Sequence, residues 1–318
     1  GAGDDSVDGG AGDDTIQIEL DAATDSLLNG NAGNDSIVLD DGTAVSTGMT
    51  VNGGDGNDLF DIDDGERIGA INAGGGSDTV NIGAGARVSG VTLGAGNDYF
   101  SGFLGGVGGN FVAGGGADTI ILADFSQSGT ILNADSSVNG GGADSVTVSF
   151  LGSSTNIKGK GGSDTITVGF ANVASTVAGN AGGDLIAVSG IAASGVQIQA
   201  GSGNDTISLA VGAAVASGTV VGGGGADSIT VSGAEVEGLT YKLGAGSDTL
   251  VFTGGTDATD LGTVVVSSLS DSTVSTLDTI NAVTGVVGAQ SIDFDLTSAG
   301  FANSAVVAIA SGTWKILK

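Results

Sequence analysis

A glycine-rich motif that ends in aspartate recurs along most of the chain, and its regular spacing constrains the fold more than any other feature. Copies read GGAGDDTI at residues 9–16, NGGDGNDLF at 52–60 and LGAGSDTL at 243–250. From Asp14 to Asp248, the last aspartate of each copy follows the previous one by 20 to 26 residues. A period of this length indicates a solenoid in which each repeat forms one coil.

Apolar residues alternate with small polar residues directly after each motif aspartate. They occupy the second and fourth positions, as in Ile37 and Leu39, and Thr or Ser commonly occupies the first. A second apolar column, which includes Leu28, lies seven residues before each aspartate. Alternation of this kind predicts two half-buried strands per coil. We therefore expect an all-β fold, a right-handed parallel β-helix or β-roll with two sheets, about 20 residues per coil and about 12 coils.

Composition excludes several functional classes. With 36 acidic and 7 basic residues, the net charge of −29 should repel nucleic acids and anionic lipids. The chain has no cysteine and no histidine, which removes thiolate metal sites and the common nucleophile–histidine systems. No apolar run reaches the roughly 18 to 20 residues of a membrane span, so direct membrane insertion is not expected. Since 40% of the residues are hydrophobic, a buried core is expected rather than disorder.

Stacked coils would bring the motif aspartates into a single file with a spacing of about 4.8 Å. Two carboxylates at that distance repel each other by about 3.5 kcal/mol at an effective dielectric near 20. A divalent cation between neighbouring turns would convert this repulsion into attraction. Calcium suits carboxylate and backbone carbonyl ligands, whereas magnesium needs stricter octahedral geometry and zinc or copper prefers His or Cys.

The copies resemble the RTX nonapeptide G-G-x-G-x-D-x-U-x over residues 1 to about 252. This resemblance implies that the first six residues of each copy form a calcium-binding turn, that the last three begin a strand, and that the ions lie between consecutive coils. It also implies calcium as a cofactor, roughly one ion per coil along one edge. The predicted metal ligands are Asp5, Asp14, Asp35, Asp58, Asp78, Asp98, Asp118, Asp144, Asp164, Asp184, Asp205, Asp227 and Asp248, with Gly12, Gly33, Gly54, Gly56, Gly74, Gly76, Gly94, Gly96, Gly114, Gly116, Gly140, Gly142, Gly162, Gly182, Gly201, Gly203, Gly223, Gly225, Gly244 and Gly246.

The chain departs from that family in the spacing of its copies. RTX copies follow each other every nine residues, whereas here only Asp5 and Asp14 keep that distance. One edge should therefore carry the metal. Small and apolar residues such as Val45, Val88 and Val215 should close the other edge.

Two features of that other edge remain to be interpreted. Glu19, Asp40 and Asp63 share one register and are either a second calcium site or solvated turn acids. Arg67 and Arg87 should align one coil apart, opposite the metal edge, where they would balance local acids.

The glycine motif stops near residue 252, and this predicts two regions: a solenoid at residues 1–252 and a β-rich capping segment at residues 253–318. The only tryptophan, Trp314, is expected to pack in the cap. Because residue 1 already lies inside the repeat pattern, we expect the chain to be a fragment or a processed product.

The function expected from the sequence is structural and not enzymatic, with no catalytic residue assigned. We expect a calcium-stiffened solenoid at the cell surface, exported by type I secretion as the RTX resemblance implies. It would self-assemble into a surface layer, filament or adhesin stalk, with contacts to cell-surface polysaccharide or lipopolysaccharide. One alternative is the non-catalytic tail of a larger secreted toxin, protease or lipase. A lesser alternative is an ice-binding β-roll, because Thr15, Thr79, Thr119, Thr165, Thr206 and Thr249 form a partial outward column.

Overall fold

The structure, a computed structural model, divides into two compact units, residues 1–161 and 162–318, and each is treated by itself. It describes residues 4–19, 26–40, 48–102, 111–123, 131–135, 141–191, 194–211, 217–233, 239–253, 260–265, 279–283, 290–295, 305–309 and 312–315. For residues 260–315 only the backbone is described.

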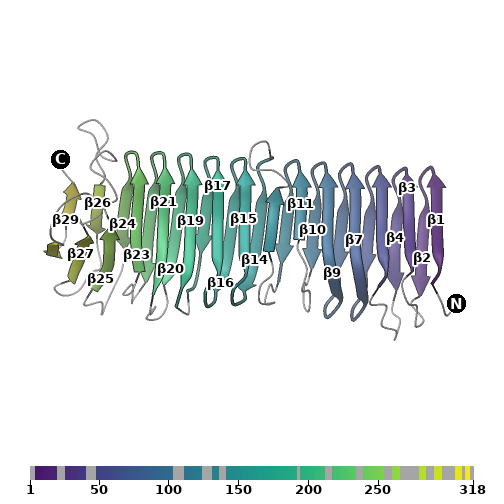
Figure 1. Ribbon diagram of the computed structural model, residues 1–318, viewed down its shortest axis with the longest axis horizontal. Coiled ribbons are helices and arrows are strands. Elements are labelled where there is room, and N and C mark those ends of the chain that lie inside the picture. The colour runs from purple at the N-terminus through teal and green to yellow at the C-terminus, as the bar shows by residue number, and fades with distance from the viewer. Residues whose placement is uncertain are drawn as a thin grey trace. The chain divides into compact units, whose positions relative to one another are not determined.

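In the first unit, odd-numbered strands form one sheet, called sheet A, and even-numbered strands form the other, called sheet B (Figure 1). The strands of sheet A are β1 (Ser6–Ala11), β3 (Leu27–Ala32), β5 (Thr50–Asp55), β7 (Arg67–Gly75), β9 (Arg87–Ala95), β11 (Phe111–Gly115), β13 (Ile131–Asp135) and β15 (Asn156–Gly161). The strands of sheet B are β2 (Thr15–Glu19), β4 (Ser36–Asp40), β6 (Leu59–Ile62), β8 (Thr79–Ile82), β10 (Tyr99–Gly102), β12 (Thr119–Leu122) and β14 (Ser145–Leu151).

The second unit repeats the same design, again with odd-numbered strands in a sheet A and even-numbered strands in a sheet B, apart from its last two strands. The strands of its sheet A are β17 (Thr176–Ala181), β19 (Val196–Ser202), β21 (Gly218–Gly224), β23 (Leu239–Ala245), β25 (Asp260–Val265), β27 (Gln290–Asp295) and β28 (Ala305–Ile309). The strands of its sheet B are β16 (Thr165–Ala171), β18 (Leu185–Val188), β20 (Thr206–Val211), β22 (Ser228–Gly233), β24 (Thr249–Thr253), β26 (Thr279–Val283) and β29 (Gly312–Lys315).

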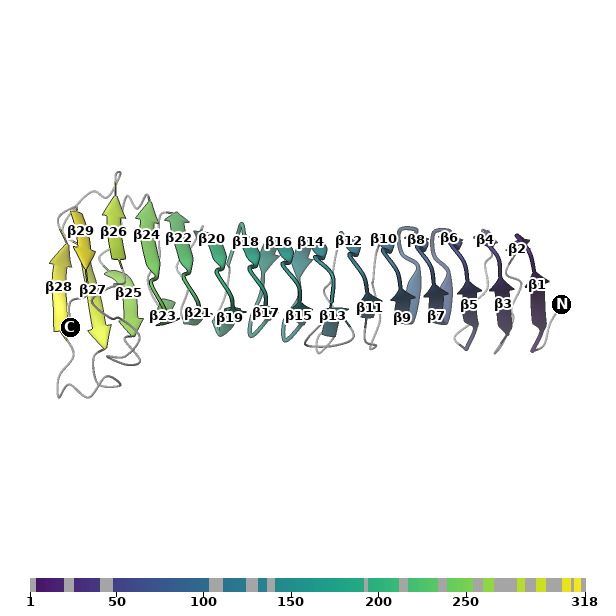
Figure 2. The same ribbon diagram turned by 90° about the horizontal axis from the view of Figure 1, so that it is seen from above.

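Consecutive strands of each sheet pair in parallel, so equivalent positions of successive coils stand in register. Phe60, for example, pairs with Ile37 on one side and Val80 on the other. Figure 2 shows the two sheets of each unit facing each other. The predicted fold class is confirmed: the chain is an all-β, two-sheet parallel solenoid with about 21 residues per coil. No described residue lies in a helix long and apolar enough to cross a membrane.

The core lies between the sheets and consists of the apolar columns predicted from the sequence. Ile37 and Leu39 of sheet B and Leu28 of sheet A are at most 1% exposed. Aromatic residues of the described core include Phe60 and the contacting pair Phe100 and Phe111. Phe100 meets Phe111 edge to face with ring centroids 4.8 Å apart, a geometry that adds to the energy of burial.

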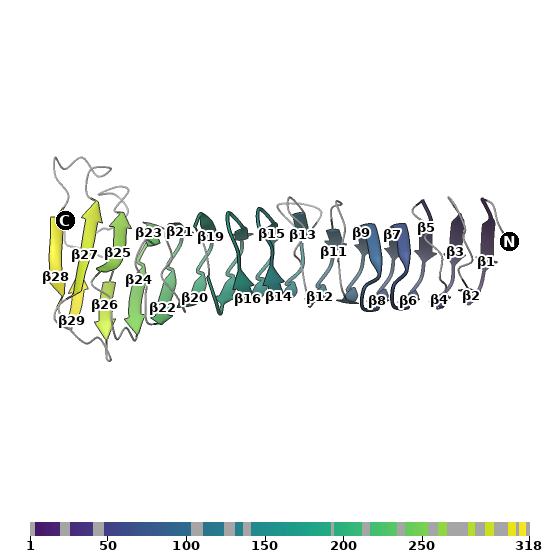
Figure 3. The ribbon, with the colours of Figure 1, turned by 90° about the horizontal axis from the view of Figure 1, so that it is seen from below.

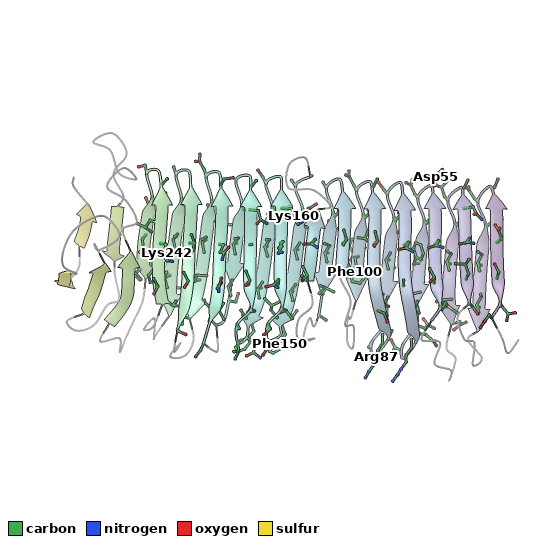
Figure 4. The ribbon with its side chains drawn as sticks, in the orientation of Figure 1. Asp55, Arg87, Phe100, Phe150, Lys160 and Lys242 are labelled. Carbon is green, nitrogen blue, oxygen red and sulfur yellow. The ribbon has the colours of Figure 1, made fainter. Side chains whose placement is uncertain are left out.

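The edge opposite the glycine turns is closed in part by small and apolar residues, and Glu66 is also fully buried there. Val88 and Ala86 are fully buried there, and the buried hydroxyl of Ser175 donates to the carbonyl of Asn172. Arg67 pairs in register with Arg87, which confirms their predicted alignment, and Figure 4 shows Arg87 pointing away from this lower edge. The predicted contributors Val45 and Val215 lie outside the described residues.

Parallel pairing continues beyond residue 252, where the glycine motif becomes hard to recognise. Strand β26 pairs in parallel with β24, and Thr279 stands opposite Thr249. Strand β28 then pairs antiparallel with β27, and β29 pairs antiparallel with β26, as Figure 3 shows. This reversal ends the parallel stacking of both sheets. The side chain of Trp314 lies outside the described residues, so its predicted packing stays a prediction.

Replacing Tyr241 by phenylalanine is expected to leave stability unchanged or to raise it by about 1 kcal/mol. The Tyr241 side chain is fully buried against Phe252, and its hydroxyl has no hydrogen-bond partner. Burial also raises the pKa of this hydroxyl. The substitution removes a polar atom whose desolvation is uncompensated. Denaturant unfolding measures the effect, with Tyr241→Leu, which loses the aromatic contact, as a destabilising control. A clear loss of stability in Tyr241→Phe would contradict the expectation.

Candidate metal-binding edge

The motif aspartates form a continuous hydrogen-bonded column in each unit, which we call the Asp ladder. Each backbone N–H donates to Oδ1 of the aspartate in the next coil. In the first unit the donor–acceptor pairs are Asp14–Asp35 at 2.8 Å, Asp35–Asp58 at 2.8 Å, Asp58–Asp78 at 2.8 Å, Asp78–Asp98 at 2.8 Å, Asp98–Asp118 at 2.8 Å and Asp118–Asp144 at 2.7 Å. In the second unit they are Asp164–Asp184 at 2.8 Å, Asp184–Asp205 at 2.7 Å, Asp205–Asp227 at 3.0 Å and Asp227–Asp248 at 2.8 Å.

The ladder aspartates lie at the turn between the two sheets, directly before each sheet B strand. Their side chains point inward, and from Asp35 to Asp248 they are only 1 to 2% exposed, whereas Asp14 is half-buried. Their main-chain carbonyls accept from the first residue of the next coil's strand, as Asp35 does from Leu59 at 2.8 Å. Side chain and backbone thus both hold adjacent coils together. Hydrogen bonds to an ionised acceptor are stronger than neutral ones.

The second carboxylate oxygen has a different environment. Oδ2 is buried and accepts no hydrogen bond at Asp14, Asp35, Asp58, Asp78, Asp98, Asp184, Asp205 and Asp227. In several coils it lies over the glycine five residues earlier. A Cβ added to Gly53 would be 2.2 Å from Oδ2 of Asp58 and 2.4 Å from the carbonyl oxygen of Ala73 in the next coil. Two oxygen acceptors therefore lie close to the Cα of that glycine, where any side chain would collide with both.

The same convergence occurs at Gly30, Gly179 and Gly222. The nearest atoms to a Cβ there include Oδ2 of the ladder aspartate and a carbonyl oxygen of the next coil, all within 2.7 Å. We call each such arrangement an oxygen cradle, made by the glycine, the aspartate five residues later and that carbonyl. Coils with a larger residue at this position lack the cradle, as at Leu93, whose buried side chain occupies the equivalent place.

Burial raises the pKa of six ladder carboxyls: Asp58, Asp78, Asp98, Asp184, Asp205 and Asp227. The pKa of Asp78 rises from 3.8 to about 7, chiefly because the side chain is removed from water and also because of the charges of Asp98 and Asp58. The pKa values of Asp184 and Asp227 rise to about 6, again mainly through burial. The backbone N–H bond acts in the opposite direction in each case but does not outweigh burial. The ladder thus disfavours its own negative charge when no cation is near.

The predicted glycine ligands serve first as conformational residues of the turn. Gly96 has a φ of +140°, and a Cβ on it would lie 1.7 Å from the carbonyl oxygen of Gly76. Its N–H donates to the carbonyl of Gly115 at 2.7 Å. A left-handed φ is shared by Gly12, Gly33, Gly54, Gly56, Gly74, Gly76, Gly94, Gly96, Gly114, Gly116, Gly162, Gly182, Gly201, Gly203, Gly223, Gly225, Gly244 and Gly246. Gly142 also packs against Gly116, whereas Gly140 lies outside the described residues.

Two further acidic residues do not belong to the ladder, and one of them, Asp5, was predicted as a metal ligand. Asp5 lies at the start of β1, at the other edge of the coil, where its N–H donates to the hydroxyl of Ser26 at 3.3 Å. Asp55 lies at the glycine-turn edge, but it is exposed and Figure 4 shows it pointing outward.

The acids proposed as a second site do come together in part. Glu19 pairs in register with Asp40, and Asp63 hydrogen-bonds to Asp40. The pKa of Asp63 is raised by desolvation, by that hydrogen bond and by the charges of Asp40, Asp61 and Asp64. This is an acidic cluster at the edge opposite the ladder. The two readings of it, metal site and solvated turn acids, stay open.

A second side-chain column was not anticipated from the sequence. Where the residue before a ladder aspartate is Asn, Asp or Ser, its side-chain oxygen can accept the N–H of the next coil, in the opposite direction to the ladder bonds. Asn34 donates to Asp13 at 2.7 Å, Asn57 to Asn34 at 2.8 Å, Ser77 to Asn57 at 2.6 Å and Ala117 to Asn97 at 2.8 Å. The recurrence of Asn at this position was the available signal.

The sequence prediction also stopped one copy too early. Asp278-Thr279-Ile280 repeats the pattern of Asp248-Thr249-Leu250, and the structure pairs Thr279 with Thr249. Asp278 itself lies outside the described residues. Its sequence position makes it a candidate for the next member of the ladder.

The donor atoms at the edge suit a hard cation. The oxygen cradles offer a carboxylate oxygen without a hydrogen bond and a carbonyl oxygen, the ligand types that calcium prefers. Within the described ranges, three or more acidic side chains do not gather into one metal-binding group. A cation at a cradle would therefore combine carboxylates with backbone carbonyls.

The chain matches no protein-family model, no curated protein and no solved structure. What the structure establishes is a parallel β-solenoid with aspartates stacked along one edge about every 20 residues.

Proposed function

We propose that this chain is a structural, calcium-binding solenoid of the cell exterior, with ions held between coils at the oxygen cradles. The observation that carries the proposal is the row of buried Oδ2 atoms without hydrogen bonds, in a chain of net charge −29. Buried carboxylate charge is costly unless it is paired or binds a metal. The resemblance to the RTX repeat supports calcium as that partner.

Calcium, when bound, would supply positive charge and additional oxygen coordination at the turn. Asp35 and Asp58 in the first unit, and Asp184 and Asp227 in the second, would hold it together with the carbonyls of the following coils. The ladder bonds through Oδ1 already align the coils. The chain's own contribution is thus to fix the spacing and direction of Oδ2 before an ion arrives.

A structural role is supported by the use of the repeat residues in coil stacking. Every ladder position serves coil stacking, and the seven basic residues are too few for an anionic substrate to be held against the acidic charge. The absence of histidine and cysteine disfavours the common catalytic systems. We therefore propose no enzymatic activity, and assembly into a surface layer, filament or stalk with contacts to surface polysaccharide or lipopolysaccharide.

An extracellular location, reached by type I secretion, is supported by calcium chemistry. Extracellular calcium near the millimolar range saturates sites of modest affinity, whereas cytosolic calcium does not. The acidic ladder would then fold with its ions after export. The non-catalytic tail of a larger secreted protein shares these properties and is the main alternative. Ice binding is less favoured, because Tyr99 and Leu185 interrupt the outward threonine column.

Counting bound calcium in ladder variants tests the proposal. Asp58→Asn keeps an oxygen that can accept the N–H of Asp35 but removes the charge at the Gly53 cradle. We expect it to bind one or two fewer calcium ions per chain, measured by atomic absorption and titration calorimetry.

Two controls accompany the count. Asp98→Asn makes the same change where Leu93 replaces the cradle glycine, and Asp8→Asn removes an exposed acid of β1. Both should bind as many ions as the unaltered chain. An equal loss of calcium in all three variants would refute the cradles as sites, and no calcium binding by the unaltered chain would refute the function.

A further inference from the structure

Among the side chains that the structure describes, one sheet surface of the second unit, over β16, β18, β20, β22 and β24, carries no charge. Many of the residues that point outward from β16, β18, β20, β22 and β24 are Thr or Ser, with Leu185 and Val251 as apolar exceptions, and none is acidic or basic. We call this surface the hydroxyl face. Its central members are Thr165, Leu185, Thr206, Ser208, Ser228 and Thr230.

The lack of charge contrasts with the formal charge of −29 of the whole chain. On the equivalent face of the first unit, Asp61 is exposed and Asp40 and Asp63 lie at the rim, whereas β8, β10, β12 and β14 carry no charged residue. On the opposite sheet of the second unit, Lys242 points outward from β23. Most approaches between two copies bring like charges together, which disfavours contact. The hydroxyl face is where a copy can approach without that cost.

The chemistry of this face is self-complementary. A hydroxyl both donates and accepts hydrogen bonds, so a row of Thr and Ser can pair with the same row on another copy. Carboxylates could not pair in this way, because they only accept. Leu185 stands among these hydroxyls with 42% of its surface exposed, and an exposed leucine gains when a partner covers it.

We propose that the hydroxyl face packs against the hydroxyl face of a second copy. The pairing is isologous, so Leu185 of each copy lies in the shared contact and the two sheets pack face to face about 10 Å apart. This contact would be one lateral contact of the assembly proposed above. It does not depend on where calcium binds.

The size of the face sets the expected affinity. Five strands at about 4.8 Å spacing, with about five residues of 3.3 Å each, cover roughly 400 Å² per copy. That is about half the area that each partner buries in a standard stable interface. The dimer should therefore be weak and visible at micromolar to millimolar concentration. Weak contacts of this kind suffice when many copies are aligned on a surface.

Sedimentation velocity over a concentration series tests the pairing, with the full chain in saturating calcium and 0.15 M salt. The unaltered chain is expected to shift from monomer to dimer. The double variant Thr206→Glu/Thr230→Glu places like charges face to face and should stay monomeric. The double variant Gln199→Glu/Thr219→Glu adds the same charge to the outer face of sheet A and should dimerise like the unaltered chain. Circular dichroism checks that both variants fold.

A second measurement locates the contact. The chain has no cysteine, so Ser208→Cys introduces a single site for a spin label, and Gln199→Cys on sheet A is its control. The pairing predicts short label-to-label distances for position 208 only. The proposal is overturned if the unaltered chain stays monomeric at millimolar concentration. It is also overturned if both double variants dimerise equally. Binding of the hydroxyl face of a monomer to neutral polysaccharide or ice would overturn it as well. Calcium counted on the same samples separates this result from a failure of the proposed function.

Discussion

Gly96→Ala is expected to destabilise the first unit by more than about 4 kcal/mol, enough to abolish its cooperative folding. Gly96 has a φ of +140°, which an alanine rarely adopts. The added Cβ would lie 1.7 Å from the carbonyl oxygen of Gly76 and 2.5 Å from its carbonyl carbon. Both atoms belong to the backbone and cannot turn away as a side chain could. Relief requires the two coils to separate, which breaks the bond from Gly76 N–H to Ala95 at 2.8 Å.

Gly115→Ala is the matched control at the same edge. Nothing lies within 4 Å of a Cβ built on Gly115, and its φ is ordinary. We expect this variant to change stability by less than about 1 kcal/mol. Urea unfolding followed by circular dichroism compares the two. Unfolding of the Gly96 and Gly115 variants at similar urea concentrations would show that close stacking of the coils at this turn does not require glycine at position 96.

The strands and the core could be predicted from the sequence because they follow directly from periodicity. Ile37, Leu39 and Leu28 had to face inward once the coil length was fixed, since a shift by one residue would expose every apolar side chain of a strand. The position of Arg67 opposite Arg87 followed from the same period. Regular repeats leave little freedom in register, which makes such predictions dependable.

The atomic arrangement at the turns could not be predicted in the same way. The sequence places Asp58 in a column but does not say that Oδ1 accepts the amide of Asp35 while Oδ2 faces Gly53. That outcome depends on one side-chain rotamer and on the distance between coils. The second column, which includes Asn34 and Asn57, was hidden because Asn, Asp, Ser, Ala and Gly all occur there. The backbone donates the bond at each copy, so the next coil tolerates a residue without a polar side chain.

Removal of calcium is expected to lower the melting temperature strongly at neutral pH and much less at pH 4.5. When the free calcium concentration is a hundred times the Kd of a site, binding at that site stabilises the fold by about 2.7 kcal/mol. Several cradles would add their contributions. Removing the ions at neutral pH also leaves the ladder charged and buried. Near pH 4.5 that second cost is smaller, because Asp78, Asp184 and Asp227 are then protonated in the folded chain.

The direction of the pH dependence follows from the raised pKa values. Asp78 titrates near 7 in the fold and near 3.8 when unfolded, and Asp184 and Asp227 titrate near 6 in the fold. The folded state therefore binds protons more tightly than the unfolded state. Stability of the calcium-free chain should be highest near pH 4 with respect to these groups and should fall as pH rises from about 4 to 7. With excess calcium the slope should reverse over the same interval, because the ion binds ionised carboxylates.

Thermal unfolding by circular dichroism at several pH values between 4.5 and 8 measures both slopes, on protein freed of calcium by chelation and desalting and on the same protein with millimolar calcium. Magnesium at equal concentration is the control, since its stricter geometry fits the carbonyl-rich cradles poorly. Opposite slopes with and without calcium would tie the ion to the buried carboxylates. Two parallel slopes would mean that calcium, if it binds, does so away from the ladder, and that the Asp ladder holds the coils together through its hydrogen bonds alone.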